Sequence, residues 1–228
     1  MDALSPGALE TAYAPIDTMG GMPNTLVPGR DVVVETEVKH SRFLAALRRV
    51  ESVADAAAFT DEQRRLYPDA RHHCWAFVVG DEPASRAERS SDDGEPGGTA
   101  GVPMLQVLHH RDVVNVAVVV TRWFGGIKLG AGGLVRAYSG AVAVALDSAT
   151  LVPRERREVF TLAVGHGNAG RVDAELRGRG VSVLGVSYED RAVFTVAARD
   201  PEQLASVVAS VTSGAGELES VGREWIDA

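Results

Sequence analysis

The sequence predicts an α+β protein of two domains, and three observations support this prediction. The chain has 228 residues, of which 45% are hydrophobic and 24% are charged, which is the composition of an ordinary globular protein. Apolar residues alternate in some segments and recur at helical spacing in others, so strands and helices are mixed along the chain. The last third follows the order β-α-β-β-α-β, which is typical of a ferredoxin-like domain.

We expect a flexible N-terminal tail at 1–27, domains at 28–150 and 158–228, and a linker at 151–157. The tail is rich in Pro and Gly and has no sustained hydrophobic period. The linker segment combines Pro153 with a run of charged residues, a composition that favours a connection between domains.

The first domain is expected to begin with two strands, a helix and a third strand. Val32 and Val34 alternate with their neighbours as in a strand, and 41–50 forms the second strand. Ser52 can cap the following helix, which Pro68 ends. The remaining elements are a strand apolar on both faces at 73–80, a long loop at 81–101, a short helix ending at His109, a buried strand at 113–121 and a helix at 130–148.

The second domain is expected to contain four strands and two helices. Pro201 suits the first turn of its second helix, because the proline lacks an N–H that would be unpaired there in any case. The predicted order is strand 159–165, helix 170–179, strand 181–188, a tight turn, strand 192–198, helix 201–211 and strand 217–226.

The charge distribution narrows the possible partners. A net charge of −8 argues against a protein that coats nucleic acid without specificity. The segment 113–146, however, contains no Asp or Glu and carries Arg122, Lys128 and Arg136. An anion-binding surface is therefore expected in this segment.

The single cysteine and the N-terminal sequence indicate a cytoplasmic protein. One Cys cannot form an internal disulfide, and no Cys-rich spacing for a zinc site is present. The first ten residues include acids and lack an apolar signal region, and no run is long enough to cross a membrane. We expect no membrane partner, no metal and no cofactor.

The glycine-rich segment 121–136 follows a predicted buried strand and opens a predicted helix. Backbone N–H groups at such a turn, together with the helix dipole, favour anions. The segment is not a P-loop, because Lys128 precedes Gly130 and is followed by Leu129. Alternatively, the glycines only permit a tight turn and close packing. The candidate residues for binding an anion or nucleic acid are Arg122, Gly125, Gly126, Lys128, Gly130, Gly132, Gly133 and Arg136.

Two aromatic residues, Trp123 and Phe124, border the basic turn of this segment. Aromatic side chains lie in a core more often than they serve as platforms on which bases stack. A place in the core is therefore the first expectation for both, and base stacking beside the basic turn is the alternative.

A second group of residues could carry acid–base, nucleophilic or metal chemistry. On a strand, His72 and Cys74 point to the same face, so a histidine could activate the thiol there. Asp93 and Glu95 lie in the acidic loop and could act as general bases or bind a divalent cation. The alternative is that Cys74 is a small buried residue and that the loop only forms turns, with Thr99 capping the next helix.

Several long motifs resemble the IMPACT/YigZ family. They are Ala70–Phe77, Asp92–Pro103 and Thr121–Tyr138, and Ser41–Phe43 fits the opening segment of the family. The resemblance implies a first domain similar to the second domain of a small-subunit ribosomal protein. It implies a second domain similar to the ferredoxin-like domains of elongation factor G. Eukaryotic relatives regulate translation by binding an activator of an initiation-factor kinase, and nucleic-acid or ribosome binding is the usual inference for bacterial relatives.

The resulting functional hypothesis is a cytosolic, translation-linked regulatory or binding protein. It would contact RNA, the ribosome or a translation factor through the glycine-rich basic turn. One alternative is an enzyme that acts on a small substrate bearing phosphate or carboxylate, with His72, Asp93 or Glu95 in the acid–base role. Another is a protein-interaction adaptor, which would expose an apolar patch.

Overall fold

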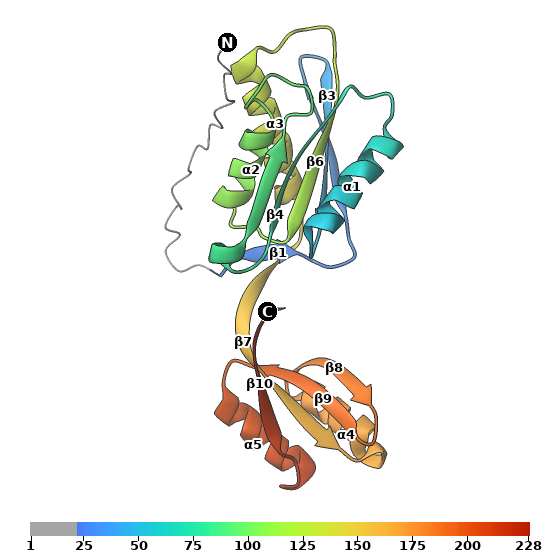
Figure 1. Cartoon of the computed structure of the whole chain (residues 1–228), viewed down its shortest axis with the longest axis vertical. Coiled ribbons are helices and arrows are strands. Elements are labelled where there is room, and N and C mark those ends of the chain that lie inside the picture. The colour runs from blue at the N-terminus through green and yellow to red at the C-terminus, as the bar shows by residue number, and fades with distance from the viewer. Residues whose placement is uncertain (1–21) are drawn as a thin grey trace, which may run out of the picture.

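The computed structural model describes residues 22–228 and contains two α+β domains connected by a long strand (Figure 1). The first domain has a sheet in the order β2-β3-β6-β4-β5, and the second has the order β10-β7-β9-β8. Each sheet is covered by helices. The predicted fold class is confirmed.

The first sheet is antiparallel between every pair of neighbouring strands. Its register places Phe43 opposite Arg122, and Arg122 opposite His72, so these three side chains share one face. The strands are β2 (Val32–Val38), β3 (Ser41–Arg49), β6 (Val116–Trp123), β4 (His72–Val79) and β5 (Ala87–Ser91).

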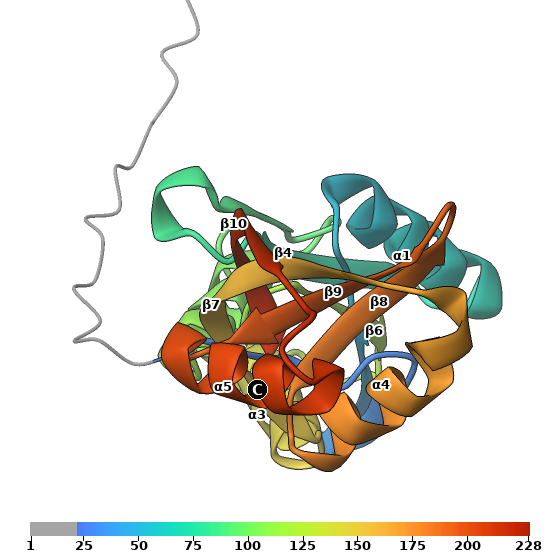
Figure 2. The same cartoon turned by 90° about the horizontal axis from the view of Figure 1, so that it is seen from below.

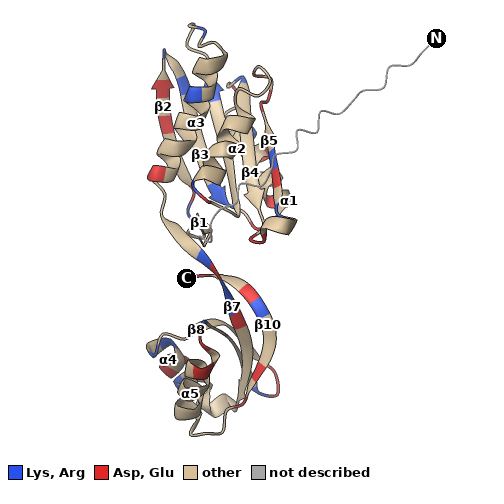
Figure 3. Cartoon of the chain, turned by 90° about the vertical axis from the view of Figure 1, so that its left-hand side faces the viewer, with Lys and Arg blue, Asp and Glu red and all other residues tan. Residues whose placement is uncertain are grey.

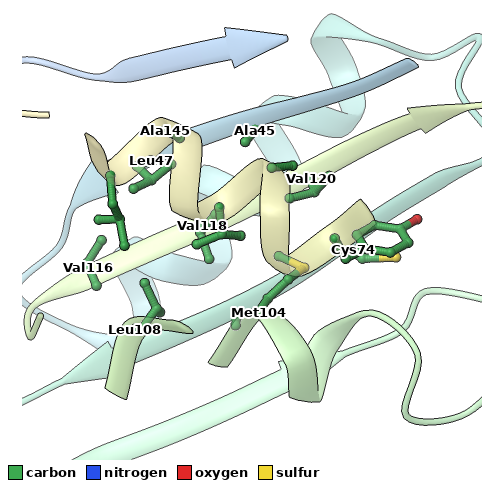
Figure 4. Close-up of a cluster of buried hydrophobic side chains, with 14 of the residues drawn as sticks. Ala45, Leu47, Cys74, Met104, Leu108, Val116, Val118, Val120 and Ala145 are labelled. Carbon is green, nitrogen blue, oxygen red and sulfur yellow. The ribbon is translucent and has the colours of Figure 1, made fainter. Parts of the chain in front are cut away.

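Helices cover both faces of this sheet. Helices α2 (Gly101–His110) and α3 (Ala131–Asp147) lie on one face, and α1 (Val53–Leu66) lies on the other (Figure 1). The larger core lies under α2 and α3 and includes Met104 and Val118 (Figure 4). Because both faces are covered, β6 is buried along nearly its whole length.

The loop expected at 81–101 contains more regular structure than the sequence predicted. It holds a short 3-10 helix at Pro83–Ser85 and the strand β5, which pairs with β4 as an edge of the sheet. An edge strand can be polar on both sides, so β5 lacks the apolar alternation that would predict it. Thr99 does not cap α2: the N-cap is Ala100, and Thr99 donates its hydroxyl hydrogen to the carbonyl of Pro96.

The second domain has the predicted β-α-β-β-α-β order. Its helices lie on the same side of the sheet (Figure 2) and cover a core that includes Leu162, Phe194 and Val208. The elements are β7 (Leu151–Val164), α4 (His166–Gly178), β8 (Ser182–Tyr188), β9 (Ala192–Ala198), α5 (Pro201–Thr212) and β10 (Leu218–Asp227).

The segment 151–157, predicted as a linker, is the first half of the strand β7. This half pairs with β10 and with β1 (Asn24–Leu26), a short strand that lies within the expected tail. The charged residues of this segment made it resemble an exposed connection in the sequence. In the structure, Arg154 and Glu155 are buried and are paired with residues distant in the chain. Residues 1–21 of the expected tail lie outside the described residues. Within 22–228, no helix has the length and apolar character needed to cross a membrane.

Candidate functional site

The glycine-rich segment forms the connection from β6 to α3 at one end of the first domain. It packs against the β2–β3 turn so closely that a Cβ on Gly125 would overlap the carbonyl group of His40. The Gly125 N–H donates to Ser41 Oγ at 3.2 Å. Gly126 and Gly130 have φ values of +87° and +72°, which favour glycine. The glycines therefore bring two turns into contact.

Three exposed cations surround this connection: Lys39 of the β2–β3 turn, Lys128 and Arg136. None has an ion-pair partner in the part of the chain that the structure describes. Lys39 and Arg136 line a pocket of about 160 Å³ together with Leu129 and Gly133. We call the three cations with the glycine connection at 125–133 the turn surface. Blue segments gather at this end of the domain, beside the acidic residues of β2 (Figure 3).

The start of α3 adds a further positive contribution to the turn surface. Its N-cap is Gly130, which has no side chain to accept a hydrogen bond from the first turn. The first-turn residues Ala131 and Gly132 are exposed. Open N–H groups and the positive end of the helix dipole both favour an anion at this position.

Arg122 lies beneath the turn surface and not on it. Its side chain is only 7% exposed, and Nη1 donates to Glu95 Oε1 at 2.5 Å. The Tyr138 hydroxyl donates to the same oxygen at 2.7 Å, and Arg122 Nη2 donates to Ser41 Oγ at 3.4 Å. The sequence predicted that Arg122 binds an external anion. The structure instead pairs its charge internally with Glu95, because the β6 register points the side chain into the domain.

The acidic loop is tied to the fold by its own carboxylates. Asp92 accepts hydrogen bonds from the backbone N–H groups of Gly98, Ala100 and Gly101, and thereby caps the start of α2. Asp93 accepts the N–H of His73 at 2.6 Å and pairs with Arg64.

The remaining catalytic candidates are also engaged within the fold. His72 Nδ1 lies 2.8 Å from the Asp93 carbonyl oxygen. Cys74 is fully buried and donates to the Asp92 carbonyl oxygen at 3.0 Å. Burial raises the pKa of the Cys74 thiol, so the nucleophilic thiolate is disfavoured. Among residues 22–228, no three His, Cys, Asp or Glu side chains are grouped to hold a metal.

Two further residues lie at or beside the site, and the candidates chosen from the sequence did not include them. Lys39 joins the turn surface only because β3 pairs with β6, a contact between distant segments that no local pattern reveals. Phe124 was expected in the core, yet it is 53% exposed, and the neighbouring Ile127 is 44% exposed. Hydrophobicity predicts burial for Phe124, whereas its position beside the basic turn was the signal for a place at the site.

Comparisons with known proteins support the family resemblance that the sequence motifs indicate. Residues 39–146 match the family model of the Impact N-terminal domain. An IMPACT family member from Haemophilus influenzae is 40% identical over 168 residues, covering 74% of this chain and 82% of the relative. The Escherichia coli IMPACT family member YigZ is 39% identical over 176 residues, covering 77% of this chain and 86% of the relative. A crystal structure of a hypothetical protein is 35% identical, with a TM-score of 0.62, covering 89% of this chain and all of that one.

Proposed function

The chain belongs to the IMPACT family, and we propose that it is a cytosolic, translation-linked binding protein that contacts RNA through the turn surface. The observation that carries the proposal is the grouping of Lys39, Lys128 and Arg136, all exposed and without ion-pair partners among the described residues, around the open start of α3. Such a surface suits phosphate groups.

The electrostatics of the turn surface are compatible with an acidic protein. The net charge of −8 is distributed over the whole chain, whereas attraction to a phosphate depends on charges within about 10 Å at moderate salt. In physiological salt, we therefore expect binding to depend on the local cations more than on the total charge. The link to translation is supported by the family resemblance, which implies this role for eukaryotic members.

The enzyme alternative has less support from the geometry. Glu95 is paired with Arg122, Asp93 with Arg64, and Cys74 is buried with a protonated thiol favoured. The polar groups that would perform acid–base chemistry thus stabilise the acidic loop and the strand ends. No observation at this site favours the alternative.

A triple variant, Lys39→Ala with Lys128→Ala and Arg136→Ala, tests the proposal. The probe is a fluorescently labelled, mixed-sequence RNA, and its anisotropy is titrated over a range of salt concentrations. We expect salt-dependent binding by the unmodified protein and an affinity about tenfold or more lower for the triple variant. The slope of log K against log salt should fall by about 0.7 for each phosphate that the variant no longer neutralises.

A matched control removes the same charge elsewhere. Arg171, Arg177 and Arg223 are exposed in the second domain, and their triple alanine variant changes the net charge by the same amount. We expect this control to bind RNA nearly as well as the unmodified protein. Equal weakening by both triple variants, or no RNA binding by the unmodified protein at low salt, would contradict the proposal.

A further inference from the structure

Phe124 is an exposed aromatic residue that directly precedes the glycine connection of the turn surface. Its side chain follows directly after β6, is 53% exposed and lies next to Gly125 of the connection. Lys128 follows four residues later, and Ile127 is also exposed. An exposed aromatic ring beside unpaired cations is the combination with which proteins bind unpaired bases and the phosphates between them.

The ring of Phe124 is supported from within the domain. The Arg122 guanidinium carbon lies 5.7 Å from the Phe124 ring centroid and 5.3 Å from that of Phe43, so Arg122 contacts both aromatic residues. Arg122 is itself fixed by Glu95, which also accepts the hydroxyl hydrogen of Tyr138. A ring that rests on a fixed group loses little conformational entropy when a ligand stacks on it.

We propose that the turn surface binds single-stranded RNA and that Phe124 provides the platform on which one unpaired base stacks. This inference rests on the proposed function and specifies the form of RNA. In a duplex, the bases are stacked on one another and their faces are not available to a protein side chain. A single strand can present a base to Phe124 while its phosphates contact Lys128, Arg136 and the start of α3.

The charge of the surface favours a nucleic acid over an apolar protein partner. Lys39, Lys128 and Arg136 form no ion pair with an acid of this chain within the described residues, and burying them against an apolar surface would cost free energy. A phosphate backbone pairs with the cations while the base covers the aromatic ring. One ligand then both pairs with the cations and covers the exposed ring.

The test compares single-stranded and duplex RNA of the same sequence in anisotropy titrations. We expect the unmodified protein to prefer the single strand. Phe124→Ala should weaken binding of the single strand about fivefold or more and leave the duplex nearly unchanged, since base stacking on an aromatic residue contributes this much. Phe124→Trp should preserve the preference. Because Phe124 is largely exposed, thermal unfolding should show that these variants remain folded.

Phe124→Leu distinguishes stacking from a general apolar contact, because it keeps apolar area and lacks a ring. We expect it to weaken single-strand binding nearly as much as Phe124→Ala. Full binding of the single strand by Phe124→Leu would overturn the inference. Equal affinity of the unmodified protein for single-stranded and duplex RNA, unchanged in Phe124→Ala, would also overturn it. With equal affinity for the two forms, RNA binding itself is still observed and the proposed function stands. Failure of both RNA forms to bind would instead contradict the proposed function.

Discussion

Two regions of the molecule use positive charge in opposite ways. At the turn surface, Lys39, Lys128 and Arg136 are exposed and have no ion-pair partners among the described residues. At the junction of the two domains, Arg49 and Arg154 are largely buried and are paired with carboxylates. The comparison separates cations that stabilise the fold from cations that are available to a ligand.

The junction joins four segments that are far apart in the sequence. Arg154, on the strand that connects the domains, donates two hydrogen bonds to Asp81 at 2.8 and 2.9 Å and a third to Asp227 at 2.8 Å. Arg49 of β3 donates to the other oxygen of Asp227 at 2.7 Å. Asp81 belongs to the first domain and Asp227 to the last strand, so this network fixes how the domains are joined.

The pKa of Asp227 reflects the same pairing. Partial burial acts to raise it, but the hydrogen bonds from Arg49 and Arg154 outweigh burial and lower the pKa overall. Asp227 therefore stays ionised in the folded protein. Within residues 22–228, the turn surface has no equivalent carboxylate paired with its cations, which leaves them available to an external anion.

The largest effect on stability is expected beneath the turn surface. Glu95→Ala removes the carboxylate that neutralises buried Arg122, whose Nε already lacks a hydrogen-bond partner among the described residues. Leaving a buried charge unpaired should lower the free energy of unfolding by about 3–5 kcal/mol, measured by urea denaturation. The double variant Glu95→Leu with Arg122→Met should recover much of this loss, because it removes both charges. A loss below about 1 kcal/mol for Glu95→Ala would show that the pair is not buried in solution.

A smaller effect is expected at the junction. Arg154→Ala leaves Asp81 and Asp227 without their shared partner, but both carboxylates retain some exposure to water, 16% and 32%. We expect a loss of about 2–4 kcal/mol in the free energy of unfolding. Arg136→Ala is the matched control at the turn surface and should change stability by about 0.5 kcal/mol or less. Equal losses in the two variants would remove the distinction between the regions.

The smallest expected effect concerns pH and His73, which lies on the α1 face of the sheet near the acidic loop. Burial lowers the pKa of His73 below its ordinary value of 6.5, more than the nearby Asp93 raises it. The neutral ring is then favoured in the folded state. Its contribution to stability is present above pH 6.5 and is lost as pH falls below that value towards the folded pKa.

His73→Gln tests this pH dependence. Unfolding free energies are compared between about pH 7.5 and 5.5, above the range in which most carboxylates titrate. The unmodified protein should lose stability on acidification, and the variant should lose less of it. An identical pH dependence in both proteins would assign the loss to other groups.

Local patterns predicted most of the elements but not the contacts between them. The helix capped by Ser52 and the β-α-β-β-α-β order were predicted correctly, because capping and hydrophobic period are local properties. The segment 151–157, predicted as a linker, is part of a strand, because buried ion pairs made that strand resemble an exposed segment. Arg122 and Phe124 also depart from what their residue types predict. The charged Arg122 is buried, and the aromatic ring of Phe124 is exposed.

The amino-acid sequence was sufficient to establish the α+β class, the glycine connection and the absence of acids in 113–146. It was not sufficient to establish which cations face solvent. The pairing of β3 with β6 brings Lys39 to the glycine connection and turns Arg122 towards Glu95. A charge is costly to bury unless it is paired, and the partner of a buried charge is supplied by contacts between residues that are distant in the chain.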